Sequence, residues 1–198
     1  MLKIGLTGGM GSGKTVVSNI FSVLGIPVFD ADRQAKLLME SQPELVTSIK
    51  QAFGEQTYEN GKLNRLRLAN IVFNNPAKLQ ELNSLVHPAT INAATAWMSV
   101  QAAPYVIKEA ALMFESGSAA NLDYVIGVYA PEEVRIQRVM ERDDVSKFQV
   151  ISRMKHQINE VIKMKLCDFV VVNDEQQLLI PQVLKLHEKF FEQSLKKK

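Results

Sequence analysis

The stretch that most constrains the fold of this 198-residue chain lies near its start. Residues 8–15 read Gly-Gly-Met-Gly-Ser-Gly-Lys-Thr and match the pattern G-x-x-x-x-G-K-[ST], which is typical of loops that bind nucleotide phosphates. The apolar segment 2–7 before the loop predicts a strand. The residues after it are apolar at helical spacing and predict a core-facing helix that begins near Lys14. Strand, loop and helix therefore follow in the order that a phosphate site requires.

Each part of this stretch has a chemical role in holding a nucleoside triphosphate. Glycines allow backbone dihedrals that are closed to other residues, so several N–H groups can converge on phosphate oxygens. The start of the helix adds the positive end of its dipole. Lys14 is expected to reach the β- and γ-phosphates, and the Thr15 hydroxyl to bind Mg²⁺. The loop residues predicted to bind ATP are Gly9, Met10, Gly11, Ser12, Gly13, Lys14 and Thr15.

The remainder of the chain alternates short apolar strands with helices. Further strands are predicted at 26–29, 105–107, 123–129 and 168–172. This alternation indicates the α/β class, with a five-stranded, mostly parallel sheet and helices on both faces. Residues 54–61 read as a polar loop, and 63–101 as helical with breaks at 74–76 and at His87-Pro88. A helical stretch this long between two strands indicates an inserted lobe suited to holding a second substrate.

Two acidic residues follow the predicted second strand. Asp30 and Asp32 precede a helix expected over about 33–40. Parallel sheets bind ligands beyond the carboxyl ends of their strands, so both carboxylates are expected near the phosphate loop. An Asp between a strand and a helix is also a common helix N-cap. The spacing alone leaves both roles open.

A group of arginines lies on the helix that Pro131 opens. Arg135, Arg138 and Arg142 are three and four residues apart and share one face. Such a stripe can be a solvated surface paired with nearby glutamates. Beside a phosphate loop, however, cations are needed over the γ-phosphate, which favours a helical lid at about 135–160. The helical pattern continues over 145–166.

Composition argues against several classes of protein. The 23 basic residues barely exceed the 21 acidic ones, and part of the excess lies in the terminal lysines 196–198, expected to be a frayed end. No basic patch with interleaved aromatic residues occurs, so nucleic acid is not expected as a partner. One cysteine excludes an internal disulfide. The sequence shows neither a signal peptide nor an apolar run that could span a membrane, so a cytoplasmic protein is expected.

Over nearly its whole length the sequence resembles the dephospho-coenzyme A kinase family. Residues 4–14 look like the opening of that family, and residues 25–32 end in its D-x-D pattern. Later matches are Arg138, residues 142–143 and the segment 168–173, which ends at Asn173. The most specific similarity is in the helical lobe, at Gly61, Leu63, Arg65, Leu68, Ile71, Val72, Phe73, Leu79, Leu82, Asn83, His87 and Pro88.

This resemblance implies a P-loop kinase fold forming a single unit over residues 1–198, with an acceptor lobe at about 58–100 and the lid. The implied reaction is ATP-dependent phosphorylation of the ribose 3′-hydroxyl of dephospho-coenzyme A, with Mg²⁺ as cofactor. Asp32 would orient that hydroxyl and accept its proton, while Lys14 and Arg138 would stabilise the transferring phosphoryl group. Further implied ATP-binding residues are Arg138, Arg142 and Asn173. The implied acceptor-binding residues are Asp32, Arg65, His87 and Pro88, although His87 is also compatible with a helix end before a proline.

The segment 109–115 departs from the family pattern, because Ala111 stands where proline is usual. Glu109 is a candidate to assist Mg²⁺ through water, and Glu115 is expected near the site with an unknown partner. A kinase of another small acceptor, such as a nucleoside monophosphate, would keep the loop and the lid but change the lobe. A GTP-binding switch protein is a weaker alternative, since residues 173–175 read Asn-Asp-Glu rather than N-K-x-D. A monomer or a weak homo-oligomer is expected.

Overall fold

The computed structural model describes residues 1–73 and 75–196. Of the break predicted at 74–76, Asn74 lies outside the described residues, as do the terminal lysines 197 and 198. The chain forms two compact units, each of which is described by itself. The first unit comprises Met1–Asp30 and the chain from Val100 onward, and the second comprises Ala31–Ser99.

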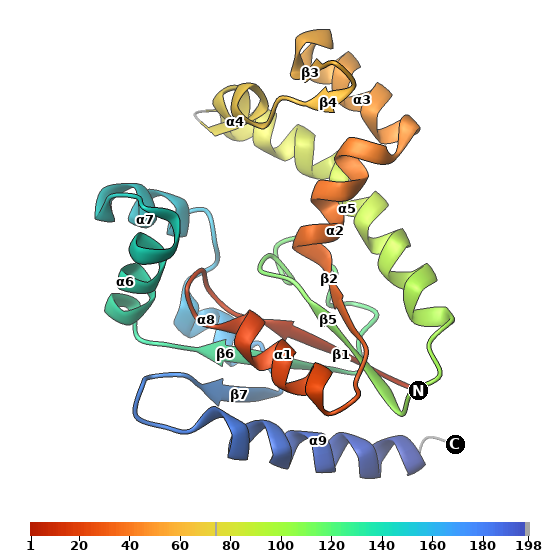
Figure 1. Ribbon diagram of the computed structural model, residues 1–198, viewed down its shortest axis with the longest axis vertical. Coiled ribbons are helices and arrows are strands. Elements are labelled where there is room, and N and C mark those ends of the chain that lie inside the picture. The colour runs from red at the N-terminus through yellow and green to blue at the C-terminus, as the bar shows by residue number, and fades with distance from the viewer. Residues whose placement is uncertain (74, 197–198) are drawn as a thin grey trace. The chain divides into compact units, whose positions relative to one another are not determined.

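A five-stranded sheet forms the centre of the first unit, and all of its neighbouring strands run parallel (Figure 1). Its strands are β1 (Leu2–Thr7), β2 (Val28–Asp30), β5 (Tyr105–Glu109), β6 (Tyr124–Tyr129) and β7 (Phe169–Val172). They lie in the order β2-β5-β1-β6-β7, so β1 is the central strand. Its register pairs Leu2 with Tyr105 and Ile4 with Tyr124. The predicted α/β class with a five-stranded sheet is confirmed.

Helices α1 (Lys14–Val23) and α9 (Leu179–Lys196) contact each other and the sheet (Figure 1). Alternate strand residues such as Leu6, Ile107 and Val128 are fully buried in one core with Phe21 of α1 and Phe190 of α9. The chain after β6 forms α6 (Glu132–Asp143), α7 (Lys147–Met154) and α8 (Glu160–Lys165), of which α8 contacts β6. Among the described residues, no helix combines the length and apolar character needed to cross a membrane.

The second unit is helical and has its own core. Its elements are α2 (Ala31–Ser41), α3 (Pro43–Phe53), the 3-10 turn η1 (Glu55–Thr57), β3 (Tyr58–Glu59), β4 (Lys62–Leu63), α4 (Arg65–Phe73) and α5 (Pro76–Ser99). α5 contacts α2, α3 and α4, and Leu45, Ile49, Leu68 and Val86 are buried in their shared core. Because the unit begins at Ala31, α2 and α3 pack together with the lobe expected at about 58–100.

Two predictions for the helical unit were wrong. β3 and β4 form an antiparallel hairpin, where a polar loop and a helix were expected. Its turn uses positive φ values at Asn60 and Gly61. α5 also runs without interruption through Pro88, so His87 lies inside the helix and not at its end. A proline removes a single N–H donor, and the contacts of α5 with three other helices offset that loss.

A third prediction was wrong in the first unit. The helix expected over 145–166 is divided into α7 and α8. Ser146 caps α7 through a reciprocal pair of hydrogen bonds with Gln149, and the Asn159 side chain accepts hydrogen bonds from the first N–H groups of α8. These caps start two short helices, and the segment between them carries the side chain of Gln157 toward the phosphate loop.

Candidate active site

The phosphate loop connects β1 to α1, as its sequence predicts. Gly13 is the residue before the helix and has φ 94°, a left-handed conformation that favours glycine. A side chain at Gly13 would also collide with Asn173 Nδ2, which donates a hydrogen bond of 2.8 Å to Ser12 O. The N–H groups in the first turn of a helix point out of its N-terminus and carry the positive end of its dipole. The loop is therefore shaped to receive an anion.

Lys14 extends along the loop that precedes it. Its Nζ donates hydrogen bonds to Gly8 O at 3.0 Å and to Gly9 O at 3.2 Å. The ammonium group is thus held over the loop by backbone carbonyls. A cation in this position can interact with the terminal phosphates of a nucleotide.

An acidic group meets the Thr15 hydroxyl at the end of β5, beside the end of β2. Thr15 Oγ1 donates to Glu109 Oε1 at 3.2 Å, and Glu109 is paired in register with Asp30 of β2. Burial raises the pKa of Glu109, and the nearby Asp30 raises it further, while Ser18, Lys14 and Thr15 oppose the rise. Oxygen ligands and negative charge at this point suit a hard cation such as Mg²⁺. No group of three or more His, Cys, Asp or Glu residues within 1–73 and 75–196 is arranged to hold a metal without other ligands.

The three arginines predicted to share a role have different surroundings. Arg138 Nη1 donates to Gly11 O at 3.5 Å and to Asn173 O at 3.3 Å, so it lies against the phosphate loop. Arg142 forms an ion pair with its neighbour Asp143 at 2.8 Å, at the end of α6. Arg135 is 6% exposed and donates through Nε to Ala130 O. Arg135 is therefore enclosed, and the stripe does not act as a single surface.

Sequence reasoning missed two residues that contact the loop and one that explains Glu115. Gln157 and Glu160 accept hydrogen bonds from loop N–H groups. The partner of Glu115 is Lys163, at 3.0 Å, and Lys163 is fully buried. Burial acts to raise the pKa of Glu115, but its hydrogen bonds from the Ile158 N–H and from Lys163 outweigh this effect and leave the pKa lowered. A lysine in a half-apolar helix gave no local sign that it is internal.

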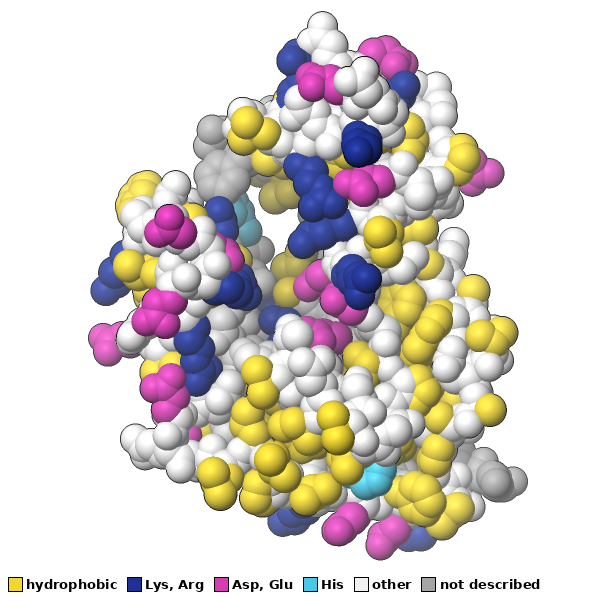
Figure 2. Space-filling view, viewed as in Figure 1, with side chains coloured by type: hydrophobic (Ala, Val, Ile, Leu, Met, Phe, Trp, Pro, Cys, Tyr) yellow, Lys and Arg dark blue, Asp and Glu magenta, His cyan; other side chains and the backbone are white. Residues whose placement is uncertain are grey.

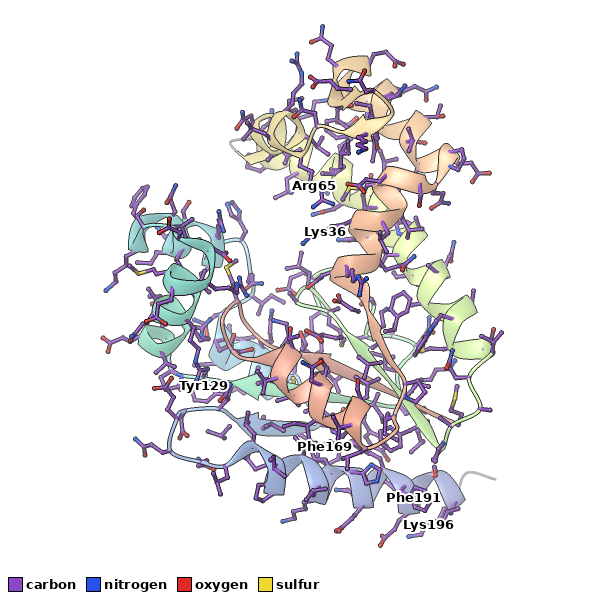
Figure 3. All side chains as sticks on the ribbon, in the orientation of Figure 1. Lys36, Arg65, Tyr129, Phe169, Phe191 and Lys196 are labelled. Carbon is purple, nitrogen blue, oxygen red and sulfur yellow. The ribbon has the colours of Figure 1, made fainter. Side chains whose placement is uncertain are left out.

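The helical unit carries the predicted acceptor residues on α2, α4 and α5. Asp32 lies exposed in the first turn of α2. Arg65 Nη2 of α4 lies 2.8 Å from Glu40 Oε1 of α2, and Figure 3 shows Lys36 of α2 on the same side of the unit as Arg65. Figure 2 shows basic side chains gathered beside α2. This unit therefore presents cations suited to an anionic ligand.

His87 and Pro88 lie in the middle of α5. His87 is half-buried and Pro88 is exposed. Burial lowers the pKa of His87, which favours the neutral imidazole. His87 is thus suited to hydrogen bonding and not to charge pairing.

Comparisons with known proteins agree with this geometry. The sequence profile of the dephospho-CoA kinase family matches residues 2–178. A dephospho-CoA kinase from Porphyromonas gingivalis is 39% identical over 189 residues, which cover 95% of this chain and 94% of the relative. Among solved structures, TT1252 from Thermus thermophilus is 33% identical with a TM-score of 0.84, and it matches over 95% of this chain and 96% of its own.

A solved dephospho-CoA kinase from Campylobacter jejuni is 26% identical with a TM-score of 0.70, over 96% of this chain and 97% of its own. The matches thus extend over both compact units, including the helical lobe. The chain belongs to the dephospho-CoA kinase family and is a P-loop kinase that uses ATP to phosphorylate dephospho-CoA, giving CoA.

Proposed function

We propose that the residues of the two units divide the work of this kinase between ATP and dephospho-CoA. The phosphate loop, Gly9 to Thr15, forms the ATP site, in which Lys14 and the backbone N–H groups of its second half, at the start of α1, hold the phosphates. Arg138 and Asn173 complete the ATP site, and Arg142 contributes from the end of α6. The observation that carries this assignment is that Arg138 and Asn173 donate hydrogen bonds to the adjacent loop carbonyls of Gly11 and Ser12, just before Gly13.

Thr15 is the proposed Mg²⁺ ligand, with Glu109 acting through a coordinated water. The observation in favour is the hydrogen bond between the Thr15 hydroxyl and the buried Glu109 carboxylate. When bound, Mg²⁺ would neutralise charge on the phosphates during transfer. Thr15 supplies a single neutral oxygen, which suits an ion that keeps several waters and binds to phosphate oxygens.

Asp32 is the proposed group that orients the ribose 3′-hydroxyl and receives its proton. The hydroxyl oxygen attacks the γ-phosphorus, the bond to the β–γ bridging oxygen breaks, and ADP leaves. The transition state of such a transfer is loose, so positioning matters more than the strength of the base. An exposed carboxylate in the first turn of α2 meets that modest requirement. Lys14 and Arg138 stabilise the charge on the transferring phosphoryl group.

Arg65, His87 and Pro88 are proposed to bind the acceptor. Dephospho-CoA carries a diphosphate between its adenosine and its pantetheine arm, and a guanidinium group is well matched to phosphate oxygens. Arg65 is 58% exposed at its side chain and is available to exchange Glu40 for such a ligand. Residues at about 135–160 are proposed to act as a lid that excludes water once the nucleotide is bound.

The experiment that tests this assignment compares Asp32→Asn with Asp30→Asn. If Asp32 is the base, Asp32→Asn should lower kcat by about 10²- to 10⁴-fold. Its Kd for ATP, measured by calorimetry, should stay within about twofold of the unmodified enzyme, because the loop is untouched. A loss of ATP affinity in Asp32→Asn would reject Asp32 as the base. So would a fall in kcat of this size in Asp30→Asn but not in Asp32→Asn.

We further propose that the enzyme acts in the cytoplasm without a nucleic acid partner, as a monomer or a weak homo-oligomer. The near balance of charge in the sequence supports the absence of a nucleic acid partner, since such partners generally demand a basic surface. Light scattering during size-exclusion chromatography at several concentrations tests the second part. A concentration-independent dimer or trimer would contradict it.

A further inference from the structure

Two N–H groups of the phosphate loop are taken up by side chains that lie far away in the sequence. Gly9 N donates to Glu160 Oε1 at 3.2 Å, and Met10 N donates to Gln157 Oε1 at 3.1 Å. Gln157 belongs to the segment between α7 and α8, and Glu160 is the first residue of α8. The proposed ATP-binding role uses the loop as an anion cradle and gives these two side chains no task.

The Glu160 carboxylate is enclosed and paired. Its side chain is 9% exposed, and its Oε2 lies 3.9 Å from Nη1 of Arg135, whose side chain is 7% exposed. A side chain at Gly9 would collide with both groups, so the loop backbone rests directly on this ion pair. An ionised carboxylate bound to a backbone N–H forms a charge-assisted hydrogen bond, which is stronger than a neutral one.

The segment that carries these acceptors is itself anchored to the rest of the first unit. Lys163 is fully buried and donates to Ala111 O at 2.9 Å, besides its ion pair with Glu115. Glu115 also accepts a hydrogen bond from Ile158 N at 3.0 Å. The position of Gln157 and Glu160 is therefore set by the chain near Ala111 and Glu115, and they transmit that position to the loop.

The loop also packs on the helices that follow. Met10 contacts a small apolar cluster formed by Ile136 and Val139 of α6 and Val150 of α7. The first half of the loop is thus held from one side by polar contacts to residues 157–160 and by apolar contacts to α6 and α7. The second half leads into the N-terminus of α1, which is the part suited to phosphate.

We propose that Glu160 and Gln157 are positioning residues that hold Gly9 and Met10, and thereby fix the phosphate loop in its binding conformation before ATP arrives. They do so from outside the nucleotide site, because their oxygens meet the N–H groups of the first half of the loop. A loop that is already ordered loses less conformational entropy when its ligand binds, so its affinity is higher. This inference rests on the loop being the ATP site.

The test uses variants that are not expected to disrupt the packing around Gln157 and Glu160. A cavity of about 410 Å³ lies beside Gln157 and Glu160, so trimming either side chain enlarges an existing hollow and does not empty a filled core. The variants are Glu160→Ala, Glu160→Gln, which keeps an oxygen acceptor, and Gln157→Ala. The matched control is Glu132→Ala, because Glu132 lines the same cavity and is exposed at the start of α6.

The first readout is amide hydrogen exchange of Gly9 and Met10, measured by NMR on the protein without nucleotide. Glu160→Ala should raise the exchange rate of Gly9 by roughly tenfold or more, whereas Glu160→Gln should restore much of the protection. Gln157→Ala should act in the same way on Met10. Unchanged exchange of Gly9 in Glu160→Ala, or an equal change in Glu132→Ala, would overturn the proposal.

The second readout is the Kd for ADP, together with the KM for each substrate. Glu160→Ala should weaken ADP binding by roughly tenfold and leave the KM for dephospho-CoA unchanged. A lower melting temperature with unchanged ADP affinity would show that Glu160 merely stabilises the fold, and would also overturn the proposal. Because exchange is read on the empty protein, it is independent of whether Asp32 or Arg65 has the role assigned above.

Discussion

In the unit built on the sheet, the candidate functional side chains are held by other parts of the same unit, whereas in the helical unit they lie on exposed helix surfaces. Lys14 is bonded to two loop carbonyls, and Arg138 to carbonyls of Gly11 and Asn173. Arg65, by contrast, is exposed and pairs with Glu40 on a neighbouring helix, and Asp32 is also exposed.

This difference is consistent with the ligands proposed for the two units. Phosphate chains are alike in all nucleotides, and fixed backbone groups can bind them with little loss of entropy. A long acceptor with a flexible arm is better matched by exposed side chains that adapt, at a cost in rotamer freedom when they are ordered. Apart from Asp32, the proposed base, substitutions in the second unit are therefore expected to weaken acceptor binding, and those at the phosphate site of the first unit to lower turnover.

Among substitutions at the phosphate loop and the arginines, the largest effect is expected for Lys14→Ala. Loss of the ammonium group over the loop removes charge stabilisation that forms during transfer, so kcat/KM for ATP should fall by about 10³-fold. Steady-state kinetics with a coupled ADP assay measures this fall. If Lys14→Ala weakened the binding of dephospho-CoA as much as the binding of ATP, the proposed division of the two ligands between the units would be contradicted.

Arg138→Ala and Arg142→Ala sharpen the comparison within the first unit. Arg138 is held at the loop, so its removal should lower kcat by about 10²-fold. Arg142 pairs with Asp143 at a side chain that is 63% exposed, so its removal should cost only a few-fold, as surface ion pairs contribute little. Single-turnover kinetics would detect the difference. Equal losses in the two variants would mean that the arginines act together, despite their different surroundings.

In the helical unit, Arg65→Ala is expected to affect the acceptor alone. Loss of one charged hydrogen-bonding group should raise the KM for dephospho-CoA by roughly tenfold and leave the KM for ATP unchanged. Arg67→Ala is a matched control, because Arg67 is an exposed arginine of the same helix that pairs with Gln56. An Arg67→Ala variant with the same defect would indicate a general effect of charge on the unit.

The smallest effect is expected for the stability of Glu109→Gln. The folded pKa of Glu109 is raised, so its ionisation costs stability as the pH rises from the unfolded pKa through the folded one. Replacement by neutral glutamine removes that cost and should raise the melting temperature at pH 7, with no gain at a pH below the unfolded pKa. Calorimetric melting curves across that range measure this effect. A gain of equal size at every pH would point to packing and not to ionisation.

The elements that could be predicted from the sequence are those whose structure depends on residues close together along the chain. Strand, loop and helix at residues 2–23 are contiguous, and their boundaries follow from glycines and helical spacing. The hairpin at 58–63 was missed because each strand has two residues, too short for periodicity. Its signal was present all the same, since Asn60-Gly61 is the dipeptide most typical of tight hairpin turns.

Other features depend on contacts between distant residues and were not predictable from local patterns. Glu160 meets Gly9 across 151 positions of the chain, and Gln157 meets Met10 across 147. The enclosure of Arg135 depends on its bond to Ala130 O and on Glu160, so the shared face of the three arginines concealed their different surroundings. Spacing along a helix indicates which side chains share a side, but it does not indicate what covers that side.

The central place of β1 in the sheet has a consequence for how the chain matures on the ribosome. β1 is made first, yet its partners are β5 and β6, whose residues Tyr105 and Tyr124 pair with Leu2 and Ile4. At roughly 5–20 residues per second, the first strand and the phosphate loop wait several seconds for these partners to be synthesised. Residues 31–99 form their compact unit from one contiguous stretch and emerge during that interval. The helical unit can therefore be complete while the nascent enzyme still lacks the sheet that supports its phosphate loop.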